Sequence, residues 1–233
     1  MKPFVTIVLM LGLLPTLGHG AAAADRDFAG VMALAPDATH GEQLFAHCMR
    51  CHSGDGGGTV EGSVPRIAGQ HYRVLVRQII DFRRGVRWDF RMEGVAKSHA
   101  TLPGLQDIAD VASYVSTLER DSERGIGQGN HLERGAAIYS ASCASCHGAQ
   151  GEGDDQKLVP RIAGQHAGYL ARQIYDAVDG RRPPLKRSHG KRFEPLVFED
   201  VLGLTDFVSR LGWQGPPIPA APGSAQPPPG AGQ

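Results

Sequence analysis

The sequence predicts an all-α fold made of two similar domains in tandem. Two observations support this prediction. Residues 48–85 and 143–180 align at a constant offset of 95, and 19 of the 38 aligned positions are identical. Near the end of each copy, apolar residues recur at the i, i+3, i+4, i+7 spacing of one helix face. A repeat of this kind indicates an internal duplication, so both halves should share one architecture.

The N-terminal segment, residues 1–24, has the features of a secretory signal peptide. Lys2 precedes an apolar stretch that ends at Leu17, and small residues follow as far as Ala24. The apolar stretch is about 14 residues long, shorter than the roughly 20 of a membrane-spanning helix, so an uncleaved anchor is the weaker alternative. We therefore expect export to the periplasm, cleavage somewhere after Gly20 and a soluble mature protein.

Charge is balanced over the whole chain, with 24 Lys and Arg against 24 Asp and Glu. This balance predicts neither nucleic-acid binding nor a general attraction to membranes. Any docking must therefore depend on local charge, which leaves a peripheral membrane contact open.

All four cysteines lie in two Cys-x-x-Cys-His strings. The residues are Cys48, Cys51 and His52 in the first string, and Cys143, Cys146 and His147 in the second. Four cysteines in an exported protein could form two disulfides, but this spacing is typical of covalent haem c attachment. Two thiols react with the haem vinyl groups while the imidazole binds the iron. A zinc site would need further cysteines, and the sequence has none. We therefore predict two covalently bound haem c groups.

Three helices are expected in each copy, in the same order. The first runs from about Asp37 to Arg50 and from about Leu132 to Ser145. The second ends at Gly85 in the first copy and at Gly180 in the second. The closing helices carry the apolar stripes Ile108, Val111, Ala112, Val115 and Leu118, and Val201, Leu204, Thr205, Val208 and Leu211. Repeats this small bury little core alone, so a large apolar porphyrin at the centre of each makes physical sense.

These elements divide the chain into domains. The first domain spans 37–118 and the second 131–213. Between them, 119–130 is charged and glycine-rich and is expected to be a linker. Residues 215–233 are dominated by Pro, Gly and Ala, which is typical of a disordered tail.

Together these features resemble the dihaem cytochrome c4 family, with two class I cytochrome c domains in tandem, over roughly residues 37–213. The resemblance implies that each domain wraps around one covalent haem. It also implies that Pro65 and Pro160 accept the proton of the proximal imidazoles through their carbonyls. The sixth ligand should come from a loop before the closing helix, and Met92 stands at the family's position for it.

The second copy departs from the family because no methionine follows Met92. In the family the axial methionine lies 7 residues before a Leu and 11 before the Asp that opens the last helix. Counting back from Leu196 and Asp200 gives His189 both times. The resemblance thus favours His189 as the sixth ligand of the second haem.

Two pairs of residues recur at equivalent positions. His71 and His166 are expected to form hydrogen bonds near the haem propionates or at the domain interface. Arg66 and Arg161 either face the propionates or lie on the surface.

Two fully ligated haems would make the chain an electron carrier between redox proteins, such as a donor dehydrogenase and a terminal oxidase or reductase. The His52/Met92 haem would then have the higher potential. The segment 181–192 has six basic and no acidic residues, which could attract an acidic partner.

Two alternatives stay open. The sixth ligand of the second haem could instead be Lys186 or Lys191, or the position could be open. With an open position, the second haem could be the site of an enzyme that acts on peroxide or a small anion. The chain could also be the cytochrome subunit of a dehydrogenase complex.

Overall fold

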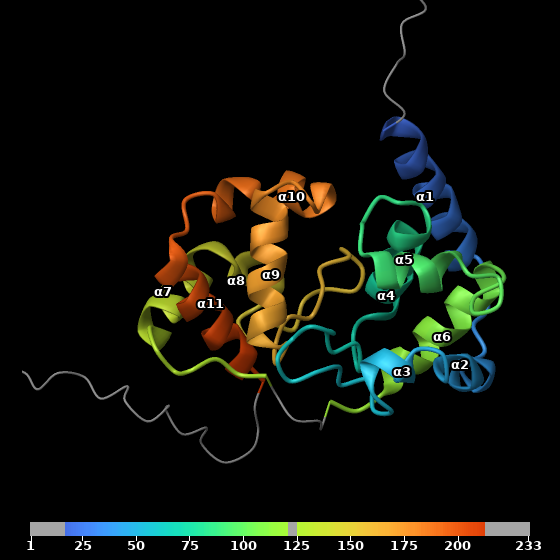
Figure 1. Cartoon of the computed structure of the whole chain (residues 1–233), viewed down its shortest axis with the longest axis horizontal. Coiled ribbons are helices and arrows are strands. Elements are labelled where there is room, and N and C mark those ends of the chain that lie inside the picture. Colours follow the sequence, from blue (N-terminus) through green and yellow to red (C-terminus); the bar gives the residue numbers. More distant parts are fainter. Residues whose placement is uncertain (1–16, 121–124, 213–233) are drawn as a thin grey trace, which may run out of the picture.

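The computed structural model describes residues 17–120 and 125–212. Within these ranges the chain is helical, and the only β pairing is an isolated bridge between Asp154 and Val159. Figure 1 shows two helical bodies joined by the segment around residue 125. The first holds α1 (Leu17–Met32), α2 (Ala38–Phe45), α3 (Met49–His52), α4 (Tyr72–Arg83), α5 (Phe90–Lys97) and α6 (Leu105–Thr117). The second holds α7 (Leu132–Ser142), α8 (Ala144–His147), α9 (Ala167–Val178), α10 (Pro183–Phe193) and α11 (Phe198–Arg210). The predicted all-α tandem fold is confirmed.

Some of the expected segments lie outside the described residues. These are 1–16 of the predicted signal peptide, 121–124 of the predicted linker and the predicted tail at 215–233.

The helix expected before each Cys-x-x-Cys-His string is divided into two. The first part, α2, begins after Asp37, whose carboxylate accepts the backbone N–H groups of the first turn. It ends at Phe45, and α3 follows as a separate short helix. In the second domain α7 and α8 are divided in the same way. The haem-binding histidine thus stands at the C-terminal end of its own short helix.

In each domain the helix before the haem-binding string packs against the last helix, α2 against α6 and α7 against α11. Gly41 of α2 lies against the carbonyl of Asp110 in α6, and an added Cβ would come within 2.0 Å of that oxygen. Gly135 of α7 meets the carbonyl of Gly203 in α11 equally closely. A larger residue at either position would push the two helices apart.

The apolar cores of the two domains differ in size. The first cluster joins residues of α4 and α6, such as Ile80 and Ile108, with Ala24 and Val31 of α1, and has twelve buried members. The second cluster has five, namely Tyr139, Ile174, Val201, Leu204 and Val208. The second domain therefore has less protein core around its haem site.

Helix α1 packs on the first domain, although its first half falls in the predicted signal peptide. Ala24 is fully buried. Asp25 pairs with Arg77 and Asp27 with Arg84, both at 2.6 Å. Helix α1 thus covers part of α4 and α6. Among the described helices, none has the length and apolar character that crossing a membrane requires.

The repeated Pro-Arg-Ile-Ala-Gly-Gln-His segment forms the contact between the domains, with approximate two-fold symmetry. The Gln70 amide donates to the backbone oxygen of Arg161 at 2.8 Å and accepts from its N–H at 2.9 Å. Gln165 binds the backbone of Arg66 in the same way, at 2.8 and 3.0 Å. One duplicated segment therefore supplies both halves of the interface.

The repeated histidines extend this interface. His71 donates from Nε2 to the carbonyl of Glu152 at 2.8 Å, and His166 donates to the carbonyl of Gly57 at 2.7 Å. The expected interface role is confirmed for both. Arg66 is only 1% exposed, so the alternative of a surface role is wrong for this residue.

The described parts of the linker are held against both domains. Arg120 donates to the equivalent carbonyls of Ala68 and Ala163, at 2.7 Å each. The N–H of Gly125 donates to Nδ1 of His166 at 2.9 Å. The linker therefore takes part in the interface.

Candidate haem sites

The four cysteines all lie in the described part of the chain and are free of disulfides. Cys51 and Cys146 are exposed, while Cys48 and Cys143 are half-buried. Among the described residues, no cluster of three or more His, Cys, Asp or Glu side chains could hold a bare metal ion.

The two proximal histidines have the same environment. His52 is 5% exposed and His147 is 8% exposed. Their Nδ1–H groups donate to the carbonyls of Pro65 and Pro160, at 2.9 and 3.0 Å. This bond fixes the tautomer and leaves the lone pair of Nε2 for iron. Burial lowers the pKa of both imidazoles, which keeps them neutral as ligands must be. The implied role of the two prolines is confirmed.

Glycines fold the loop that brings each proline carbonyl back to its histidine. Gly58 has φ +76° and Gly153 has φ +72°. An added Cβ at either position would lie 2.6 Å from the oxygen of Pro65 or Pro160. Only glycine combines this backbone conformation with such a close approach.

Met92 lies on the first turn of α5, in a helix where the sequence suggested a loop. Asp89 caps this helix by accepting the N–H of Arg91 at 3.0 Å. Met92 itself is half-buried. Burial is the main cause of the low pKa of His52. The charge of Arg91 also lowers this pKa, and the charge of Asp89 raises it. The charged side chains at the start of α5 therefore act electrostatically on the first proximal histidine.

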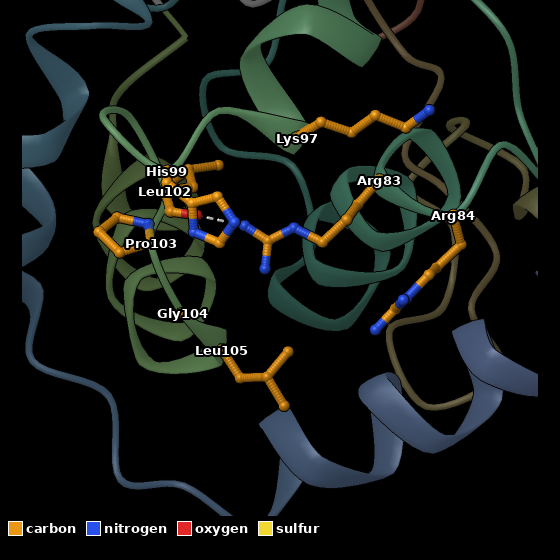
Figure 2. A pocket seen from close by; sticks show the side chains of 8 residues that line it. All are labelled: Arg83, Arg84, Lys97, His99, Leu102, Pro103, Gly104 and Leu105. Carbon is orange, nitrogen blue, oxygen red and sulfur yellow. Dashed lines mark hydrogen bonds between the residues drawn. The ribbon is translucent and has the colours of Figure 1, made fainter.

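A clamp from α4 holds the other end of α5. Arg83 donates from Nε to the carbonyl of Ala96 at 2.7 Å and from a terminal nitrogen to the carbonyl of Leu102. Figure 2 shows the guanidinium reaching from α4 across a hollow toward the loop after α5. Two further cations that line the hollow, Arg84 and Lys97, are paired with acidic side chains. These three basic side chains thus bind other groups of the protein, and Arg83 holds the C-terminal end of α5.

His189 extends from α10 toward His147. The centroids of the two imidazole rings are 6.0 Å apart and their planes are inclined by 42°. Phe193 stacks on His189 at 5.2 Å, and the Ser188 hydroxyl lies 2.7 Å from its Nδ1. Burial, followed by the neighbouring His147 and two arginines, lowers the pKa of His189 to about 4. The imidazole is therefore neutral at physiological pH, with Nδ1 occupied.

The six cations of 181–192 do not form one patch. Arg181 pairs with Asp176 at 2.7 Å, and the side chain of Arg182 turns into the domain interface. Lys186 donates to the carbonyl of Val178 at 3.0 Å. The exposed cations that remain on α10 are Lys186, Arg187, Lys191 and Arg192.

The structure brings together one polar cluster that sequence comparison did not identify. Gln78 and Gln173 accept hydrogen bonds from both Arg87 and Arg182 across the interface. Both pairs are separated by 95 positions. Arg87 and Arg182 lie two residues beyond the repeated segments 48–85 and 143–180, so their equivalent positions are the sequence signal for this cluster.

Comparison with known proteins agrees with this geometry. The family model described as Cytochrome c matches residues 38–119 and again residues 132–206. Two such matches, each around one Cys-x-x-Cys-His string, define a tandem c-type cytochrome. Cytochrome c4 from Pseudomonas aeruginosa is 32% identical over 180 residues, which cover 75% of this chain and 83% of that protein. The chain belongs to the dihaem cytochrome c4 family.

A solved structure and a further relative extend the comparison. The crystal structure of reduced recombinant cytochrome c4 from Pseudomonas stutzeri is similar with a TM-score of 0.66 at 26% identity. The match covers 76% of this chain and 100% of that chain. A protein described as thiosulfate dehydrogenase electron acceptor, from Stutzerimonas stutzeri, is 29% identical over 136 residues. That alignment covers 54% of this chain and 61% of the relative.

The residues at both sites suit the group that the family carries. Each domain offers two thiols and one neutral, oriented imidazole. The chain therefore binds two haem c groups covalently and is a dihaem electron-transfer cytochrome.

Proposed function

We propose that the chain is a periplasmic electron carrier in which His52 and Met92 bind haem 1, and His147 and His189 bind haem 2. Haem c supplies one-electron chemistry at its iron. With these four side chains as ligands, neither haem would have a position left for a substrate. The role of the chain is then to hold the haems at a fixed distance and to dock partners.

The observation that carries this proposal is the 6.0 Å separation of the His147 and His189 rings. Metal–imidazole bonds are about 2.0–2.1 Å long, and the ring centre lies about 1.1 Å beyond the nitrogen, so two imidazoles on opposite sides of one metal have centroids about 6.3 Å apart. The neutral state of His189 also supports ligation. Its Nδ1 contact with Ser188 leaves Nε2 for the iron.

Different ligands should give the two haems different potentials. A methionine ligand raises the potential of haem iron relative to a second histidine. We therefore infer that haem 1 is the higher-potential centre and haem 2 the lower. Electrons would pass from haem 2 to haem 1.

The partner of haem 2 is proposed to be an acidic redox protein. Helix α10 turns His189 inward, and its exposed cations Lys186, Arg187, Lys191 and Arg192 would attract negative charge. Similarity to a thiosulfate dehydrogenase electron acceptor favours a dehydrogenase as the donor. Copurification of a large partner would instead favour a fixed cytochrome subunit.

Replacement of His189 tests the ligand assignment. In oxidised His189→Ala, haem 2 should become high-spin in the visible and EPR spectra, while haem 1 is unchanged. His99→Ala is the matched control, because Ser98-His99 resembles Ser188-His189 in sequence and His99 is exposed. A low-spin haem 2 in His189→Ala would eliminate this ligand. A high-spin haem in the wild-type protein would overturn the carrier proposal in favour of an enzyme acting on peroxide or a small anion.

Charge reversal tests the docking proposal. Arg187→Glu with Lys191→Glu should slow electron exchange with an acidic partner about tenfold at low salt, and added salt should reduce the difference. Arg26→Glu, on the exposed side of α1, is the control. An equal effect of both changes would contradict docking at α10.

We also propose export with cleavage directly after Gly20. Cleavage there would keep the buried Ala24 in the core of the first domain. Cleavage after Ala24 would remove it. The intact mass of the periplasmic protein distinguishes the two sites.

A further inference from the structure

Two arginines and two glutamines interlock across the domain interface. Arg87 donates from one terminal nitrogen to Oε1 of Gln78 in its own domain, and from the other to Oε1 of Gln173 at 3.0 Å and to the hydroxyl of Tyr169 at 2.7 Å. Arg182 donates to Oε1 of Gln173 at 2.6 Å and to Oε1 of Gln78 at 3.1 Å. Each arginine therefore binds one glutamine of each domain.

This arrangement brings two positive charges together on neutral acceptors. Gln173 is only 9% exposed. Burial and then the charge of Arg87 lower the pKa of Arg182 to about 9. Removing such charges from water costs free energy. The cluster is therefore stable only while both terminal nitrogens of each guanidinium group have hydrogen-bond acceptors. Separation of the domains would remove three of these five bonds.

The two arginines stand at the beginnings of the helices that carry the distal ligands. Arg182 is the N-cap residue of α10, seven residues before His189. Arg87 lies two residues before Asp89, the N-cap of α5, and five before Met92. The start of each helix is therefore anchored to a glutamine of the opposite domain.

We propose that Arg87 and Arg182 are positioning residues through which docking of the two domains fixes the distal ligands Met92 and His189. The proposal rests on the axial ligands proposed above. A shift at the start of α5 or α10 moves the ligand relative to its haem, because the helix transmits the displacement. Since the two arginines share both glutamines, ligation in one domain is coupled to the other.

Cyanide binding to the oxidised protein measures how easily each distal ligand is displaced. Arg182→Ala should speed cyanide binding at haem 2 about tenfold, and Arg87→Ala should do so at haem 1, which is a typical coupling between sites. Arg181→Ala is the matched control, because Arg181 is exposed and pairs only with acids of its own domain. Its rates should equal those of the wild-type protein.

The diagnostic variant is Gln173→Ala. This residue lies on α9 in the second domain, yet its loss should speed cyanide binding at haem 1 and weaken the visible band of methionine bound to ferric haem. A purely local role of Gln173 would leave haem 1 unchanged. The proposal would be overturned if cyanide bound at the wild-type rate at haem 1 of Gln173→Ala and at both haems of the two arginine variants.

Conservative variants keep the test decisive if an alanine variant fails to fold. Arg87→Lys and Arg182→Lys keep the charge but cannot reach two glutamines at once, so smaller increases at the same haems are expected. Wild-type rates in both would again overturn the proposal. If His189→Ala shows that His189 is not a ligand, the experiments on Met92 at haem 1 still decide the coupling.

Discussion

The two domains share their proximal halves and differ in their distal halves. His52 and His147 each donate to a proline carbonyl across a loop folded by an equivalent glycine. On the distal side, α5 offers a methionine, whereas α10 offers a histidine that lies 6.0 Å from the opposite imidazole. The side that attaches haem is therefore alike in the two domains, while the side that holds the proposed distal ligand differs.

The supports of the two distal helices diverged as well. In the first domain Arg83 of α4 clamps the end of α5 through two backbone carbonyls. The equivalent position in α9 is Val178, whose carbonyl accepts a bond from Lys186 of α10. The direction of the bond is reversed, but both distal helices remain tied to the preceding helix. The geometry of the distal side is thus kept by different residues.

The largest expected difference between the domains is their dependence on haem. Cys143→Ser with Cys146→Ser should remove one haem and unfold the second domain, because its buried apolar cluster is small. Cys48→Ser with Cys51→Ser should also remove one haem but leave more helix, because α1 enlarges the first core. Intact mass counts the haems, and hydrogen exchange reports order in each domain. Equal losses of protection would contradict the comparison.

The helix crossing that both domains share should be about equally sensitive in each. Gly41→Ala and Gly135→Ala each bring a Cβ within 2.0 Å of a backbone oxygen, so each should cost about 3 kcal/mol of unfolding free energy. Denaturant titration measures this loss. Gly94→Ala is the control, since nothing lies within 4 Å of its Cβ position. An unchanged midpoint for either crossing variant would show that its domain tolerates separation of the two helices.

Exchange of the distal ligands should reduce the contrast between the haems. His189→Met should raise the potential of haem 2, and Met92→His should lower that of haem 1, each by on the order of 0.1 V. This shift equals about 2.3 kcal/mol for one electron. Spectroelectrochemical titration resolves both haems. A shift of haem 1 in His189→Met as large as that of haem 2 would contradict separate ligand control.

The features that sequence predicted depend on short, repeated segments. The Cys-x-x-Cys-His strings, the proline carbonyls and the interface histidines all lie in the duplicated windows, where local chemistry limits the alternatives. The docking of α1 was missed because small apolar residues near Ala24 also suit a signal peptide. The equivalence of Arg87 and Arg182 is present in the sequence, but their cluster was missed because each also binds a glutamine of the opposite domain. Such contacts depend on how two folded bodies meet, which periodicity does not encode.

The smallest expected effect concerns a pair across the helix crossing in which only the first domain uses a histidine. His40 of α2 donates from Nδ1 to Asp110 of α6 at 2.8 Å, whereas in the second domain Arg134 of α7 pairs with Asp200 of α11. The hydrogen bond to Asp110 raises the pKa of His40. A raised pKa means that the contribution to stability is complete below the ordinary histidine value, about 6.5, and is lost as pH rises through the folded value. The difference in unfolding free energy between the wild-type protein and His40→Gln should therefore shrink between pH 6 and pH 8, by a small amount because His40 is partly exposed. Denaturant titrations across this range measure the difference, and a constant value would show that the pair does not contribute through its charge.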